Sequence, residues 1–136
     1  ADNHILRQVP PQAKRRVISR ETARSVTKIL EGVVTDGTGT HAAIPGFRVA
    51  GKTGTAQKID PRTGAYSASR FVASFTGYAP ADNPQLAMIV VIDEPLGDTQ
   101  GGAVAAPVFS RVGEQVLSYL GVPSNAPITL AMASRK

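Results

Sequence analysis

The chain has 136 residues, of which 42% are hydrophobic, and this length fits one domain, or a piece of one, that buries its own core. The absence of cysteine excludes disulfides and thiolate metal sites. The two histidines, His4 and His41, lack the spacing of metal ligands, so we expect no metal and no other cofactor.

Positive charge is concentrated at the start of the chain. The net charge is +5, and residues 1–28 contain seven Lys and Arg against two acidic residues, whereas the charges of residues 29–136 balance. Lys14, Arg15 and Arg16 form a basic arm that suits an anionic surface. Because no aromatic residues are interleaved with these cations, we interpret them as a solvated face and expect no nucleic-acid partner.

No segment has the length and apolarity of a membrane span. The longest apolar run, Leu86 to Ile92, is far too short to cross a bilayer, and the chain does not open with a signal-peptide pattern. We therefore expect any membrane anchor to lie outside this sequence.

The first third of the chain predicts an arm and one helix. Residues 1–18 contain Pro10-Pro11 and are predicted to be an extended basic arm. Ser19 is a helix N-cap followed by Glu21 in the first turn, and the helix is expected to end near 36–37. Its predicted buried stripe is Ala23, Val26, Leu30 and Val33. The polar loop 37–40, Gly-Thr-Gly-Thr, is a second glycine-threonine cluster that could touch a ligand, but turn chemistry explains it without one.

The most informative stretch is the predicted strand from Val49 to Ala56. Side chains alternate along a strand, so Thr53 and Thr55 are expected to project to one side. Lys52 supplies a cation, the threonines supply hydroxyls, and Gly54 removes side-chain bulk beside them. These groups suit a cleft that binds a carboxylate and an oxyanion.

Two simpler interpretations of this stretch remain. An edge strand with small residues and a solvated lysine would need no ligand. The segment 46–53 also matches the spacing of a phosphate loop, but such a loop opens a helix. Here Phe47 to Ala50 are predicted to be strand already and Gly54 sits where that helix would begin, so we interpret the match as chance.

The second half of the chain predicts two more strands and a final helix. A turn at 60–64 leads into a strand in which Phe71, Ala73 and Phe75 face one way, and a turn at 81–84 leads into the strand 86–92, whose continuous apolar character predicts cover on both faces. The last helix is expected to start near Ala105 and to end at Gly121. Its predicted stripe is Ala105, Val108, Val112, Val116 and Tyr119 or Leu120. The predicted fold is α+β, an antiparallel sheet packed by N- and C-terminal helices.

Several phrases in this order resemble the C-terminal part of the transpeptidase domain of class B penicillin-binding proteins. The resemblance covers about Val17 to Leu120. The phrases are Ile18-Ser19-Arg20-Glu21-Thr22-Ala23, Leu30-Glu31-Gly32-Val33-Val34, Ile44-Pro45-Gly46, Val49-Ala50-Gly51-Lys52-Thr53-Gly54-Thr55-Ala56-Gln57, Phe75-Thr76-Gly77-Tyr78-Ala79-Pro80, and Gly101-Gly102 with Ala106-Pro107-Val108-Phe109. It implies that residues 19–121 are the C-terminal portion of the transpeptidase domain. Because the pattern is lost from Ser124 onward, we interpret residues 122–136 as a flexible tail or linker.

The resemblance implies an acyl-transfer enzyme that attacks the penultimate D-Ala carbonyl of a peptidoglycan stem peptide with a serine and binds β-lactams as mimics. Of the family's motifs Ser-x-x-Lys, Ser-x-Asn and Lys-Thr-Gly, only the third is present. Ser25 and Lys28 match the letters of the first motif, but they lie on a helix that follows the other two motifs in the family, so the match is chance. We therefore expect the nucleophile on a missing upstream part, and this chain alone to be inactive.

The family pattern assigns roles to the Lys-Thr-Gly residues. It implies that Lys52 hydrogen-bonds the serine of the second motif, that Thr53 and Thr55 bind the substrate carboxylate, and that the Thr55 N–H forms half of the oxyanion hole. Gly54 would let the substrate pair with the strand. Gln57 and Tyr66 are candidate outer contacts.

The resemblance also implies partners and a location. These are stem peptides, β-lactams, the upstream part of the domain, and cell-division or elongation proteins, at the periplasmic face of the cytoplasmic membrane. Two alternatives remain from the residues: a non-catalytic binding module that uses the basic arm, and a related serine β-lactamase or D,D-carboxypeptidase.

Overall fold

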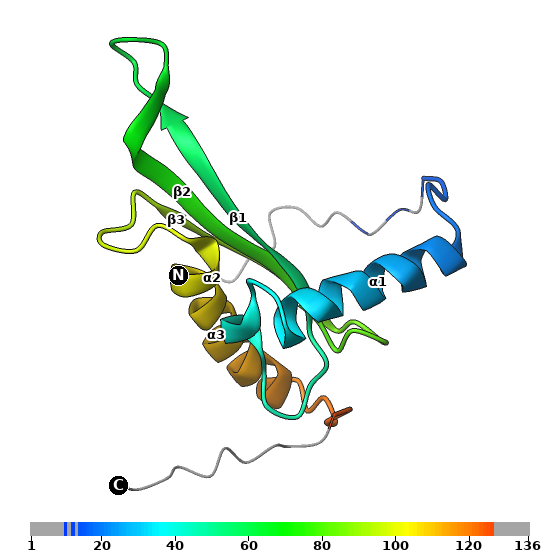
Figure 1. Ribbon diagram of the computed structural model, residues 1–136. Coiled ribbons are helices and arrows are strands. Elements are labelled where there is room, and N and C mark those ends of the chain that lie inside the picture. The colour runs from blue at the N-terminus through cyan, green and yellow to red at the C-terminus, as the bar shows by residue number, and fades with distance from the viewer. Residues whose placement is uncertain (1–9, 11, 13, 127–136) are drawn as a thin grey trace, which may run out of the picture.

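A three-stranded antiparallel sheet with helices at both ends of the chain forms the fold (Figure 1). The computed structural model describes residues 10, 12 and 14–126. The elements are α1 (Arg20–Thr35), η1 (Thr40–Ala42), β1 (Ala50–Ile59), β2 (Tyr66–Ala79), β3 (Leu86–Asp93), α2 (Gly101–Val104) and α3 (Ala106–Tyr119). The predicted α+β class is confirmed.

Helix α1 begins where its capping residue predicts. The Ser19 side chain accepts a hydrogen bond from the Thr22 N–H at 3.0 Å, and the helix ends at the cap residue Asp36. The predicted buried stripe is wrong at Val26, which is 44% exposed, whereas Val34 is buried. The reason is that α1 packs at the β1 edge of the sheet, where the sheet covers the last turns of the helix more than the first.

An ion pair ties α1 to the segment before β1. Arg48 donates to both carboxylate oxygens of Glu31 at 2.8 and 2.9 Å, and this hydrogen bonding raises the pKa of the guanidinium. Because the Arg48 side chain is about half exposed, we expect the pair to contribute little to stability.

The strand order is β1-β2-β3, so β1 and β3 are the edges of the sheet in the described residues. Strand β1 begins at Ala50, and the prediction of strand from Phe47 was wrong because the Phe47 N–H bonds the Ile44 carbonyl at 3.0 Å in a turn. The predicted turn at 60–64 is confirmed, with Gly64 N–H donating to the Asp60 carbonyl at 2.8 Å. The β1–β2 hairpin extends well beyond β3 (Figure 1).

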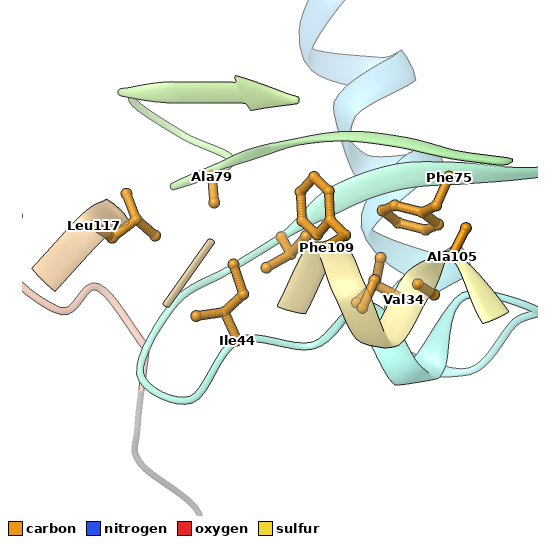
Figure 2. Packing of buried hydrophobic residues seen from close by; sticks show 10 residues of the cluster. Val34, Ile44, Phe75, Ala79, Ala105, Phe109 and Leu117 are labelled. Atoms are coloured by element: carbon orange, nitrogen blue, oxygen red, sulfur yellow. The ribbon is translucent and has the colours of Figure 1, made fainter. Parts of the chain in front are cut away.

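Helix α3 covers one face of the sheet and forms the core with it. Phe109 packs edge-to-face on Phe75, with ring centroids 4.8 Å apart (Figure 2). The predicted stripe is confirmed at Ala105, which is buried, but is wrong at Val112, which is 38% exposed. The residues that α3 buries are Ala106, Phe109, Gly113 and Leu117. Gly113 explains why α3 can turn this face toward the core, because a Cβ at this position would lie 2.6 Å from Ile44 Cδ1.

The opposite face of β3 is uncovered in the part of the chain that the structure describes. Ile89 is 63% exposed and Val91 is 55% exposed, so within the described residues the strand is covered on one face and not, as the sequence had predicted, on both. Burial instead alternates along β3. Helix α1 reaches this side of the sheet near Tyr78, whose hydroxyl lies 2.8 Å from that of Thr27, and stops short of β3.

After α3 the chain returns to the loop before β1. Gly121 has a φ of 64° and follows the end of the helix, as predicted. The Asn125 side chain accepts from the Arg48 N–H at 3.0 Å and donates to Asp82. Among the described residues, no helix is both long and apolar enough to cross a membrane.

Candidate functional site: the Lys-Thr-Gly strand and its cleft

Strand β1 places the predicted site residues on two faces. Thr53 lies opposite Phe75, whereas Lys52 lies opposite Thr76. Thr55 follows two residues after Thr53, so both threonines point to the side covered by α2 and α3. The expectation that the two hydroxyls share one side is therefore met by the geometry.

The Thr55 hydroxyl is held by the segment that opens α2. The Gly101 N–H donates to Thr55 Oγ1 at 3.3 Å, and Thr55 Oγ1 lies 3.5 Å from Gln100 Oε1. Because a backbone amide can only donate, the oxygen of Thr55 accepts from Gly101, and the Thr55 hydroxyl donates to Gln100 Oε1 over the longer distance.

The Thr53 hydroxyl is held from the other side. Its Oγ1 lies 2.8 Å from Thr38 Oγ1 and 3.4 Å from Lys52 Nζ. The ammonium of Lys52 also donates to the Thr53 carbonyl at 3.0 Å. The lysine therefore bends around the edge strand toward the threonines, although its own Cβ belongs to the opposite face.

The glycines of the motif have packing roles. A Cβ on Gly51 would lie 2.4 Å from Phe75 Cζ, so this residue lets the aromatic core reach the strand. A Cβ on Gly54 would lie 2.5 Å from Ser74 Oγ, a neighbour on β2. On the faces of the sheet, the close approach at these two positions is thus made by other parts of the chain.

An open cleft of about 410 Å³ adjoins Thr53 on its α2 side. Its lining includes Thr38, Thr40, His41, Asp98 and Gln100. These side chains offer hydroxyl, imidazole and amide groups with a single carboxylate. Within the described residues, no three His, Cys, Asp or Glu side chains gather as a metal site would require.

Sequence reasoning missed the residues that orient the threonines. The sequence favours turn chemistry over a ligand contact for the Gly-Thr-Gly-Thr loop at 37–40 and does not indicate that Thr38 reaches Thr53, 15 residues away. The sequence also gives no indication that Gly101 contacts Thr55. The Gly-rich segments 37–40 and 101–102, which lie before and after the Lys-Thr-Gly motif in the sequence, were the signal from which these residues could have been found. That the two segments meet at β1 depends on the fold.

Other candidate residues lie away from the cleft. Ser25 and Lys28 are exposed on α1, and the cleft lining includes neither of them. Gln57 donates to the Ser67 carbonyl at 3.3 Å further along the hairpin, and Tyr66 is 72% exposed near the hairpin tip. The phosphate-loop alternative fails on geometry, since Gly54 continues a strand where a helix would have to open.

A family model described as the penicillin-binding protein transpeptidase domain matches residues 2–114. The chain belongs to this family. The resemblance drawn from the motifs is thereby confirmed, and the three-stranded sheet with its helices is part of the penicillin-binding protein transpeptidase fold.

Curated relatives of this transpeptidase chain are much longer proteins. Stage V sporulation protein D of Bacillus subtilis is 47% identical over 82% of this chain and 17% of its own length. A probable peptidoglycan D,D-transpeptidase PenA of Neisseria gonorrhoeae is 42% identical over 90% of this chain and 21% of its own length. The chain therefore spans about a fifth of these relatives, which belong to an enzyme family.

Solved transpeptidase structures agree with the fold. The transpeptidase domain of penicillin-binding protein 3 from Burkholderia pseudomallei matches 83% of this chain and 34% of that domain, with a TM-score of 0.74 and 46% identity. Penicillin-binding protein 3 from Mycobacterium tuberculosis, in complexes with aztreonam and with ampicillin, matches 90% of this chain with a TM-score of 0.76 in both. The chain covers 29% and 30% of those two structures, at 35% and 34% identity.

Proposed function

We propose that this chain supplies the Lys-Thr-Gly wall of a serine D,D-transpeptidase site that cross-links peptidoglycan stem peptides. The observation that carries the proposal is the pair of hydroxyls on one face of β1, Thr53 and Thr55, each contacted by a neighbouring segment, with Thr53 lining an open cleft. Two hydroxyl protons on one face of an edge strand suit the two oxygens of a carboxylate.

Each motif residue has a role in this proposal. Thr53 and Thr55 bind the carboxylate of the stem peptide or of a β-lactam. Lys52 hydrogen-bonds the serine of the Ser-x-Asn motif and keeps the cleft electropositive. The Thr55 N–H forms half of the oxyanion hole, and Gly54 lets the substrate backbone lie along β1, whose outer edge is unpaired in the described residues.

The nucleophile comes from elsewhere in the proposal. An upstream part of the domain, carrying Ser-x-x-Lys and Ser-x-Asn, packs on this chain and completes the site. Loss of a single oxyanion-hole donor costs about 10² to 10³ in rate, so a chain with half a hole and no serine is inactive. The complete protein works at the outer face of the cytoplasmic membrane, held by an anchor outside this sequence, with cell-division or elongation proteins as partners.

The relatives' names support transpeptidation over the β-lactamase or carboxypeptidase alternative, since several are named D,D-transpeptidases. The Mycobacterium tuberculosis complexes with aztreonam and ampicillin support β-lactam binding. Arg15, Arg16 and Arg20 are exposed, as a solvated basic face requires.

A fluorescent penicillin tests the proposal. The chain alone is expected to give no covalent adduct, whereas the chain joined to a polypeptide with the two upstream motifs gives one. In the joined protein, Thr55→Val is expected to slow acylation by about 10- to 100-fold, because a hydrogen bond to a charged group is lost. The same assay on Lys28→Ala, which changes an exposed residue of α1, serves as the control.

A stable adduct on the chain alone would contradict the proposal and would direct attention to Ser25. Failure of the joined, folded protein to react with the penicillin would also contradict it.

A further inference from the structure

The loop between α1 and η1 brings one hydroxyl to the strand that carries the proposed carboxylate site. Thr38 Oγ1 lies 2.8 Å from Thr53 Oγ1, a hydrogen-bonding distance. Nothing in the established family match assigns Thr38 a role. The question is what this second hydroxyl does for the first.

The backbone around Thr38 is held on several sides. The Gly39 N–H donates to the Val33 carbonyl at 2.9 Å, which closes the end of α1. A Cβ on Gly102 would lie 2.1 Å from the Thr38 carbonyl oxygen, so α2 touches the loop directly. The His41 Nδ1 lies 3.1 Å from the Gly102 carbonyl and links η1 to the same turn of α2. Thr38 is therefore fixed in front of β1 although its side chain is exposed.

The direction of the hydrogen bonds decides what Thr53 can offer to a ligand. A hydroxyl has one proton to donate, and a carboxylate can only accept. The Lys52 ammonium, 3.4 Å from Thr53 Oγ1, can only donate to that oxygen. If Thr53 donated to Thr38, its proton would be used within the protein and none would remain for the carboxylate.

Thr55 shows how the neighbouring hydroxyl avoids this problem. The Gly101 N–H donates to the oxygen of Thr55 at 3.3 Å, and the Thr55 proton meets only Gln100 Oε1 at 3.5 Å. That distance is too long for a strong O–H···O bond, so a carboxylate can take the proton over. A donor aimed at Thr53 Oγ1 would produce the same result on the other hydroxyl.

We propose that Thr38 is a positioning residue whose hydroxyl donates to Thr53 Oγ1, so that the Thr53 proton faces the carboxylate of the substrate. This inference rests on the proposed function, because it assumes that Thr53 binds a carboxylate. Thr38 then acts through Thr53 and polarises its hydroxyl, as chained hydrogen bonds do.

The test uses the joined protein, in which this chain is linked to a polypeptide that carries the two upstream motifs. The variants are Thr38→Val and Thr38→Ser. Acylation is measured with benzylpenicillin, which has the carboxylate, and with its methyl ester, which lacks the negative charge. Thr38→Val is expected to lower the second-order rate with benzylpenicillin by about 5- to 10-fold, the effect of one net hydrogen bond, and to leave the ester rate unchanged. Thr38→Ser keeps the donor and is expected to restore the rate.

The matched control is Thr35→Val, the same substitution three residues earlier. Thr35 donates to Asp36 at 2.8 Å at the end of α1 and does not reach β1. We expect its rates with both probes to equal those of the unsubstituted protein.

Three results would overturn the inference. Thr38→Val with an unchanged benzylpenicillin rate would show that the hydroxyl does not position Thr53. An equal loss with both probes, with a lowered melting temperature, would show a structural role instead. If the unsubstituted protein reacts with neither probe, the proposed function fails and the role of Thr38 fails with it.

Discussion

Gly101 has no side chain at the point where α2 meets the sheet, and this absence keeps the Thr55 hydroxyl in contact with its donor. A Cβ at this position would lie 2.2 Å from the Ser74 carbonyl oxygen and 2.5 Å from that of Gly54. Both neighbours are backbone atoms of paired strands, so they cannot move aside cheaply. Any larger residue must displace α2 from β1.

We therefore predict that Gly101→Ala weakens both stability and acylation. The expected loss in unfolding free energy is about 1 to 3 kcal/mol, as for other overpacked sites, and acylation slows because the Gly101 N–H moves away from Thr55. Urea unfolding and penicillin acylation of the joined protein measure the two effects.

The control for this prediction is Gly32→Ala on α1, where a Cβ would meet nothing within 4 Å. Alanine should stabilise that helix by about 0.5 to 1 kcal/mol. A Gly101→Ala protein as stable and as reactive as the Gly32→Ala protein would contradict the steric argument.

At the residue scale, the sequence predicted which side chains of β1 share a face, because this depends only on alternation along one strand. Thr53 and Thr55 share a face because they are two residues apart, and Lys52 faces away for the same reason. The partners of these hydroxyls, Thr38 and Gly101, lie 15 and 46 residues away. No local pattern encodes such a meeting, so this half of the site became visible only in the fold.

Among the elements, the three strands are joined by a charge cluster at the far end of the sheet. Lys58 on β1 donates to Asp93 at 2.9 and 3.0 Å, and its Nζ lies 2.8 Å from Glu94 Oε1. Arg70 on β2 lies 3.8 Å from the same Glu94 oxygen. The hydrogen bonds that Lys58 donates to Glu94 and, to a smaller extent, to Asp93 raise the pKa of Lys58 above its ordinary value.

This shift gives a pH prediction with a definite sign. A lysine whose pKa is higher in the folded state stabilises the fold fully below the unfolded pKa, and the contribution is lost as the pH rises through the folded pKa. Lys58→Met should therefore lower the melting temperature slightly at neutral pH. The difference from the unsubstituted protein should vanish in strongly alkaline solution, and should shrink at high salt because the group is solvent-accessible.

Thermal unfolding measured from pH 7 into strongly alkaline solution, well above the ordinary lysine pKa, checks this prediction. Lys28→Met is the control, because no ion pair of Lys28 occurs in the described part of the chain. A Lys58→Met effect that persists unchanged at alkaline pH would mean that lost packing of the aliphatic stem, and not charge, explains it.

The elements themselves were predicted better than their buried faces. Capping and turn residues such as Ser19 and Gly121 gave the limits of the helices because those signals are local. The prediction for α3 places valines on the buried face of the helix. In the structure, Gly113 faces Ile44 and Phe109 faces Phe75. Complementary shape between two elements decided the face, and hydrophobicity alone did not.

For the whole molecule, the notable feature is the unpaired edge and uncovered face of β3 in the described residues. Ile89 and Val91 expose apolar surface beside this edge. An exposed edge strand with apolar side chains is a site of association between chains. In the proposed complete protein, the upstream part covers this surface.

We predict that the chain on its own self-associates through β3. Ile89→Lys with Val91→Lys should reduce the association measured by sedimentation velocity, since charge on an edge strand opposes pairing. The same double substitution should destabilise the joined protein, where the surface is covered. Ile29→Lys, at a position 70% exposed on α1, is the control.

A chain that stays monomeric at high concentration would contradict this account of β3. An antiparallel strand can leave one face in water, but then that face is usually polar. The reason to expect a covering segment is that the exposed side chains Ile89 and Val91 are apolar.

The contact between Gly101 and Thr55 has a consequence for synthesis on the ribosome. The Lys-Thr-Gly residues leave the exit tunnel before the amide that orients Thr55 has been translated, because 46 positions separate the two. A nascent or prematurely terminated product ending at Pro95 would contain the entire motif and still lack that donor. Labelling of the finished protein by a β-lactam would therefore also show that translation had passed Gly101.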